Sequence, residues 1–167
     1  MRDVFILRTD EGACIGPFAV ASIPKCGQHT LDKYAVCKVP ESKLNNFPLR
    51  IAFIREPFDR WLSAYHFMCQ SRYILEGERV REYNRFVDVA LESEDDHVLP
   101  QSRFISSFGT LLPLHSMSKV IGALTGKEIT KENASERHEI DTSYRKAEIM
   151  ERYEDDTILY KSITEAE

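Results

Sequence analysis

Two short apolar runs, each followed by a loop and a helix pattern, constrain the fold more than any other feature of the chain. The first run covers residues 18–23, is ended by Pro24, and is followed by a helix-compatible pattern at residues 30–36. The second run covers residues 49–54, and Pro57 stands where the next helix should begin. Strand, loop and helix in alternation are typical of a parallel sheet flanked by helices. The chain is therefore predicted to have an α/β fold with a short central parallel sheet.

The helix predicted after the second run separates an apolar face from a polar one. Between residues 57 and 69 the apolar side chains recur at helical spacing and form one stripe: Phe58, Trp61, Leu62, Tyr65 and Met68. Arg60, Ser63 and Phe67 lie on a different face. Similar patterns predict further helices at residues 79–93, at 116–125, and from 143 to beyond 153.

The composition is that of one globular domain. With 167 residues, of which 43% are hydrophobic and 29% charged, the chain can bury a core and is predicted to form a single domain over residues 1–167. No apolar stretch has the roughly 20 residues of a membrane-spanning helix, and no secretory signal pattern begins the chain, which favours a soluble, cytoplasmic protein without a membrane partner. The four cysteines form no C-x-x-C pair, so we expect free thiols and no zinc site.

Charge is distributed unevenly along the chain, whose net charge is −5. Residues 126–167 carry 7 basic and 12 acidic side chains and account for the whole deficit. This balance argues against a nucleic-acid partner. Residues 50–103, however, contain eight arginines and no lysine. Because a guanidinium can bind phosphate through two parallel hydrogen bonds, one or two of these arginines are candidates for an anion site.

The loop after the first strand has the chemistry of an anion site. Residues 23–31 turn from a strand into a helix, where backbone N–H groups have no intrahelical acceptor. Gly27 allows a ligand to approach the backbone closely. Lys25 supplies a positive charge that could stabilise negative charge developing on a leaving oxygen. The complete phosphate-loop pattern G-x-x-x-x-G-K-[ST] is absent. A lysine in an ordinary surface turn is the alternative interpretation.

The loop after the second strand carries a second set of donors. Arg55 follows the strand, and Ser63 lies on the polar face of the next helix, so guanidinium and hydroxyl can converge on one phosphate. In the alternative interpretation, Arg55 pairs with Glu56 or Asp59 and Ser63 is a plain surface residue.

Together the two loops resemble the sulfotransferases that use 3′-phosphoadenosine 5′-phosphosulfate (PAPS), especially their carbohydrate sulfotransferase branch. The residues that match the family's 5′-phosphosulfate motif are Lys25, Gly27, Thr30 and Leu31. Those that match its 3′-phosphate motif are Arg55, Pro57, Arg60, Ser63 and Tyr65. Further on, residues 97–101 look like the His-x-x-Pro-Gln segment of that branch, and the resemblance continues from about residue 18 to the end of the chain.

The resemblance implies a P-loop-like fold and transfer of a sulfonate group from PAPS, without a metal ion, to a hydroxyl acceptor that is a small molecule or a glycan. It also implies the donor-binding residues: Lys25, Cys26, Gly27, Gln28, His29, Thr30, Arg55 and Ser63. Lys25 is implied in catalysis as well. Cys26, Gln28 and His29 stand where the family has hydroxyl or small residues, so backbone donors are expected to contribute more here.

His97 is the favoured general base, because imidazole titrates near neutrality and the surrounding segment matches the family. Four other candidates stay open: His29, His66, Asp32 and Glu41. Asp95 and Asp96 beside His97 are interpreted as solvated charge. Arg137 is either a further contact to the 3′-phosphate or a member of a C-terminal salt bridge.

Two other functions are compatible with strand, loop and helix. A nucleotide-dependent phosphotransferase would need a magnesium site and a complete phosphate loop, neither of which is found in the sequence. A non-catalytic nucleotide-binding module would keep the fold but lack the base. Titration with adenosine 3′,5′-bisphosphate, with and without magnesium, discriminates among these functions. Tight metal-independent binding supports a sulfotransferase or the non-catalytic module, and preference for ATP with magnesium supports the phosphotransferase.

Overall fold

The computed structural model describes residues 3–7, 18–130 and 139–165. Arg137 lies outside these ranges. The side chains of His29 and Glu41 are likewise outside the described part of the molecule. Of the cysteines, Cys26 and Cys69 are described and are free thiols.

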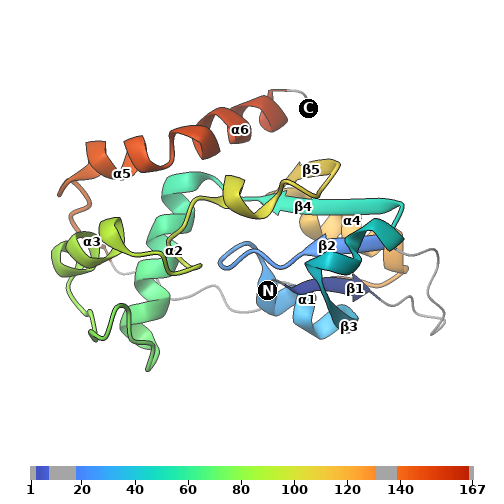
Figure 1. Cartoon of the computed structure of the whole chain (residues 1–167), viewed down its shortest axis with the longest axis horizontal. Helices are drawn as coiled ribbons and strands as arrows, with labels where there is room; N and C mark the ends of the chain where they lie inside the picture. The colour runs from blue at the N-terminus through green and yellow to red at the C-terminus, as the bar shows by residue number, and fades with distance from the viewer. Residues whose placement is uncertain (1–2, 8–17, 131–138, 166–167) are drawn as a thin grey trace.

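A mixed sheet of five strands forms the centre of one part of the molecule (Figure 1). The strands are β1 (Asp3–Leu7), β2 (Phe18–Ala21), β3 (Ala35–Pro40), β4 (Leu49–Ile54) and β5 (Thr110–Pro113). Their order is β3-β1-β2-β4-β5. The predicted parallel sheet is confirmed for β2, β4 and β5, whereas β1 pairs antiparallel with both β2 and β3.

The helices lie where the sequence patterns predict them, but several begin or end at other residues than predicted. The α-helices are α1 (Gln28–Tyr34), α2 (Pro57–Gln70), α3 (Tyr83–Glu92), α4 (Met117–Thr125), α5 (Lys146–Arg152) and α6 (Glu154–Thr164). The 3-10 turns are η1 (Glu41–Asn46), η2 (Gln101–Phe104) and η3 (Leu114–Ser116). None of the helices in the described ranges is long and apolar enough to cross a membrane.

The helix predicted at residues 30–36 begins earlier and ends at Tyr34. The chain enters β3 directly at Ala35, where residues 35–40 pair with β1. Val36 and Val39 are β-branched and fit a paired strand better than a helix, so tertiary pairing overrides the helical pattern there. The helix predicted at residues 79–93 is also shorter and begins at Tyr83.

Helix α2 stands between the sheet and helix α3 (Figure 1). Pro57 occupies its first turn, and the Glu56 carboxylate accepts a hydrogen bond from the Asp59 N–H at 2.6 Å, which satisfies one N-terminal amide. The apolar stripe packs against α3, with the rings of Trp61 and Phe86 centred 4.9 Å apart. With this stripe buried, the polar face of α2 is fixed in direction.

The carboxyl ends of β2 and β4 lie next to each other. The two strands are parallel neighbours, with Phe18 opposite Leu49 and Val20 opposite Ile51. Both are buried where they end, β2 along its whole length and β4 over residues 51–54. The loops after these two strands therefore leave the sheet at the same edge, where ligands of α/β folds bind.

Candidate functional site

The loop after β2 is shaped by two left-handed residues. Lys25 has φ +66° and Gly27 has φ +81°, and between them the Cys26 N–H donates to the Ile23 carbonyl at 3.1 Å. The Leu31 N–H then donates to the Gly27 carbonyl at 3.0 Å and marks the first turn of α1. A lysine in this conformation is uncommon, and such backbone strain is found preferentially at functional sites.

Gly27 is required by packing as well as by its φ angle. A Cβ added there would lie 2.7 Å from Met117 Sδ and 3.3 Å from Leu114 Cδ1. Met117 is buried, so it has little room to move away.

A matched pair of substitutions tests this packing. We expect Gly27→Ala to lower the free energy of unfolding by about 1 kcal/mol more than Gly77→Ala, because overpacking adds to the φ strain that both share. Gly77 is the control, since it has φ +80° but no atom within 4 Å of an added Cβ. Urea unfolding of both variants measures the difference, and equal losses would contradict the predicted clash.

Two arginines bind the backbone of this loop. Arg55, the residue after β4, donates from Nη1 to the Lys25 carbonyl at 3.2 Å. Arg60, in the first turns of α2, donates from Nε to the Pro24 carbonyl at 3.0 Å. The predicted anion loop and the predicted phosphate-binding arginine are thus in direct contact.

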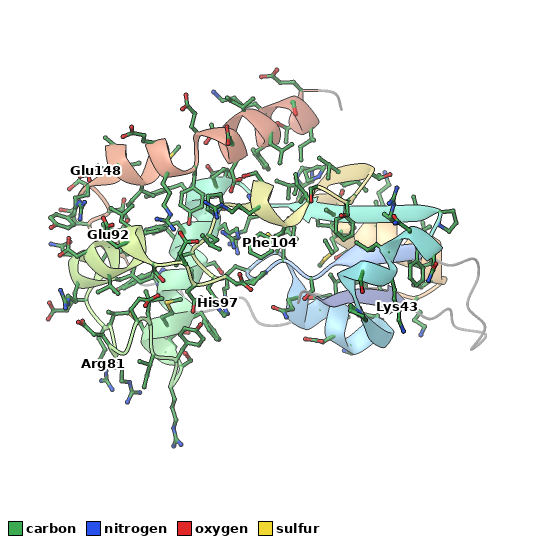
Figure 2. The ribbon with its side chains drawn as sticks, viewed as in Figure 1. Lys43, Arg81, Glu92, His97, Phe104 and Glu148 are labelled. Atoms are coloured by element: carbon green, nitrogen blue, oxygen red, sulfur yellow. The ribbon has the colours of Figure 1, made fainter. Side chains whose placement is uncertain are left out.

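Arg60 also holds the segment that contains His97. Its side chain is fully buried, and it donates from Nη1 to the Leu99 carbonyl at 2.7 Å and from Nη2 to the Asp96 carbonyl at 3.1 Å. Its guanidinium carbon lies 6.0 Å from the ring centre of Phe104, which Figure 2 labels with His97. A buried arginine with all three nitrogens bonded to carbonyls fixes the position of both segments.

Positive charge is concentrated around Lys25. Burial, together with repulsion from Arg55 and then from Arg60, lowers the pKa of Lys25 to about 8. The Lys25 Nζ atom lies 4.1 Å from the ring centre of Phe67 on α2. Because an anion would relieve this repulsion, the site has the electrostatics of an anion-binding site.

His97 contacts the same phenylalanine. Its ring stacks on Phe67 with centres 5.2 Å apart and 11° between the planes, and Tyr73 packs edge-on against it at 4.8 Å. His97 Nδ1 lies 2.9 Å from Asp95 Oδ1. The Phe67 ring thus contacts both the ammonium group of Lys25 and the imidazole of His97.

The interpretation of Asp95 as solvated charge is wrong. One carboxylate oxygen accepts from the backbone N–H of His97 at 2.9 Å and faces its ring, and the other accepts from the Tyr73 hydroxyl. Although burial opposes ionisation, the hydrogen bonds from Tyr73 and His97 hold the pKa of Asp95 below its ordinary value. An ionised carboxylate at Nδ1 favours a proton on that nitrogen and leaves Nε2 as the basic one.

Ser63 belongs to the face of α2 that meets these groups. It lies three residues after Arg60 and four before Phe67, and helical spacing places all three on one face. Arg60 and Phe67 contact the Lys25 loop from this face. The half-buried Ser63 makes no hydrogen bond to another described side chain or backbone group, so its hydroxyl is available to a ligand.

Cys26 is predicted to bind the sulfonate donor, but its side chain contacts Gln101 inside the protein. It is 2% exposed, and its thiol donates to Gln101 Oε1 at 3.0 Å. Burial raises the pKa of this thiol, which excludes a reactive thiolate at neutral pH. Since its N–H also bonds within the loop, we conclude that Cys26 stabilises the conformation of the loop.

Of the other predicted loop residues, Thr30 is buried and Gln28 is half-buried at the start of α1.

The competing bases are placed differently from His97. His66 is 4% exposed and packs its ring against that of Tyr65 at 5.1 Å. Asp32 is exposed on α1, while the side chains of His29 and Glu41 are not among those described. Among the described residues, no three His, Cys, Asp or Glu side chains form a group that could hold a metal ion.

Three side chains that contribute to this arrangement carry no predicted role, namely Phe67, Asp95 and Gln101. Asp95 could have been recognised from its position two residues before His97. Phe67 could have been recognised from its place on the polar face of α2 with Arg60 and Ser63. Gln101 belongs to the His-x-x-Pro-Gln segment, but no sequence pattern indicates what its amide contacts.

Comparison with known proteins gives one match. The family model described as "Sulfotransferase family" matches residues 22–165, which include both loops, helix α2 and His97. Searches of the curated proteins and of the solved structures found no match.

Proposed function

The chain belongs to the sulfotransferase family, and on that premise we propose that it transfers a sulfonate group from PAPS to an acceptor hydroxyl and releases adenosine 3′,5′-bisphosphate. The observation that carries this proposal is the contact between Arg55 and the carbonyl of Lys25. It places the two loops that resemble the 5′- and 3′-phosphate motifs side by side, as a doubly phosphorylated nucleoside requires. The acceptor is a small molecule or a carbohydrate.

In this proposal the two loops bind opposite ends of the donor. The left-handed turn at Lys25 and Gly27 receives the 5′-phosphosulfate, through Lys25 and the backbone amides that open α1. Arg55 and Ser63 bind the 3′-phosphate, the former through its guanidinium and the latter through its hydroxyl. The depressed pKa of Lys25 supports an anion at this position, since a bound anion favours the charged ammonium.

In the proposed reaction the protein aligns the reactants, stabilises the leaving group and accepts a proton from the acceptor. The S–O bond to the acceptor forms while the bond between sulfur and the 5′-phosphate oxygen breaks, so the reactants must be held in line. Lys25 stabilises the negative charge that develops on the leaving phosphate oxygen. His97 accepts the acceptor proton at Nε2, with Asp95 holding the proton on Nδ1.

Isothermal titration calorimetry tests this function. We expect adenosine 3′,5′-bisphosphate to bind with an affinity that does not change when magnesium is removed, and ATP with magnesium to bind more weakly. Turnover with labelled PAPS and a panel of sugar and phenolic acceptors then tests transfer. Preference for magnesium and ATP would favour a phosphotransferase, and bisphosphate binding without any turnover would favour a non-catalytic module.

Ser63→Ala tests the assignment of the 3′-phosphate. We expect its affinity for adenosine 3′,5′-bisphosphate to fall by about tenfold, as for loss of one hydrogen bond to a charged group, with little change for adenosine 5′-phosphate. Ser162→Ala on α6, where the serine is exposed, is the control and should leave both affinities unchanged. Equal losses for the two nucleotides would remove Ser63 from the 3′-phosphate site.

The pKa of Lys25 predicts a pH dependence of binding. Because this pKa lies at about 8 in the free protein, Lys25 loses its charge as the pH rises through that value, and affinity for the bisphosphate should fall with it. Lys25→Arg keeps a positive charge over this range, so its affinity should stay constant from about pH 7 to about pH 9.5. Calorimetry at a series of pH values measures both proteins, and parallel profiles would contradict the prediction.

A further inference from the structure

We propose that Gln101 is a positioning residue that sets the spacing between the two donor-binding loops and is itself held in place by Asp156 of the C-terminal helix. This inference rests on the proposed function and extends it to residues with no assigned role. We call Gln101 and its three partners, Cys26, Arg55 and Asp156, the Gln101 bridge.

The side chain of Gln101 joins the ends of two strands. It is fully buried; its Oε1 accepts from the Arg55 backbone N–H at 2.9 Å, and its Nε2 donates to the Arg55 carbonyl at 2.8 Å. The same Oε1 accepts from the Cys26 thiol at 3.0 Å. The amide is thus bonded on both sides in the only orientation that satisfies the backbone of Arg55. It connects the residue after β4 to the loop after β2.

Asp156 fixes the backbone of Gln101. This carboxylate is fully buried, and it accepts from the Gln101 N–H at 2.6 Å and from the Ser102 N–H at 2.8 Å. These two amides begin η2, so Asp156 acts as its cap from a distant part of the chain. Figure 1 shows α6 running along the side of the molecule where η2 and β5 lie.

The arrangement has a consequence for a ligand with two phosphates. We call the Lys25 loop and the donors of the 3′-phosphate the two half-sites. The second phosphate of such a ligand adds binding affinity only if the second half-site lies at the correct distance when the first is occupied. Without the bridge, the Lys25 loop and the end of β4 keep their own donors but lose a buried connection between them. The bisphosphate should therefore lose affinity, whereas ligands that occupy one half-site should not.

Three ligands distinguish this role from a general loss of stability: adenosine 3′,5′-bisphosphate, adenosine 3′-phosphate and adenosine 5′-phosphate. In Gln101→Met, which keeps the length of the side chain, we expect the bisphosphate affinity to fall by at least about tenfold and each monophosphate affinity to change by less than about threefold. Hydrogen exchange of the Arg55 amide should become faster, because its acceptor is gone.

Asp156→Asn provides a second variant that keeps the shape of the side chain, with Asp155→Asn on the exposed face of α6 as its matched control. The first should give the same selective loss for the bisphosphate, and the second should behave as the unmodified protein. Equal losses for all three ligands, or unchanged bisphosphate affinity in Gln101→Met, would overturn the bridge. Failure of the unmodified protein to prefer the bisphosphate over the monophosphates would overturn the proposed function instead, and the inference with it.

Discussion

We expect Lys25→Ala to lower kcat by on the order of a hundredfold or more, while affinity for the nucleotide changes much less. In the proposed reaction the Lys25 charge acts on an oxygen whose negative charge increases in the transition state, so its loss should affect the transition state more than the bound ground state. Initial rates at saturating labelled PAPS give kcat, and calorimetry with adenosine 3′,5′-bisphosphate gives the affinity.

Lys43→Ala is the matched control, because Lys43 is exposed on η1 and lies at the far side of the molecule from His97 (Figure 2). Its kcat should equal that of the unmodified protein. Unchanged turnover in Lys25→Ala would exclude Lys25 from the reaction. A loss confined to nucleotide affinity would restrict it to binding.

His97→Ala should lower kcat by about a hundredfold to ten-thousandfold, the range for a general base, and leave bisphosphate affinity unchanged. In the proposed reaction the imidazole, which Phe67 and Asp95 hold in place, accepts the substrate proton, so its removal takes away that acceptor without altering the phosphate donors. Labelled transfer assays and calorimetry separate the two effects.

Asp95→Asn tests the orientation of His97 independently. An asparagine amide can donate to Nδ1 and so favour the tautomer with its proton on Nε2, which cannot act as the base; kcat should therefore fall although His97 is present. His115→Ala, which changes an exposed histidine, is the control. If His97→Ala keeps full activity, the base is another of the candidates, and His66 and Asp32 are the next to be changed.

The two strand–loop–helix units that contain Lys25 and Arg55 can be predicted from local patterns alone. The strand at Leu49–Ile54 has the bounds that its apolar run predicts, and α2 extends only one residue past the predicted end. An apolar β-branched run and a proline in the first helical turn are local signals, so they survive in the folded protein. The sequence predicts Lys25 and Arg55 at neighbouring strand ends, and the Arg55 side chain lies 3.2 Å from the Lys25 carbonyl.

The antiparallel half of the sheet cannot be predicted in the same way. Strand β3 comes after α1 without a loop, and its pattern continues that of the helix. Only its pairing with β1 makes residues 35–40 a strand, and this pairing depends on a partner about thirty residues away. Local propensity carries no information about such a partner.

The sequence by itself determined which chemical groups lie at the ends of the parallel strands, because a strand end, a glycine turn and a helix start are encoded within a few residues of one another. The tertiary structure alone decided that His97 packs on the same phenylalanine as Lys25, since Phe67 of α2 contacts both side chains. It also decided that Gln101 contacts Arg55, 46 residues away, and Asp156, 55 residues away. Contacts of this kind arise when buried helices and strands pack together, and no short pattern in the chain specifies them.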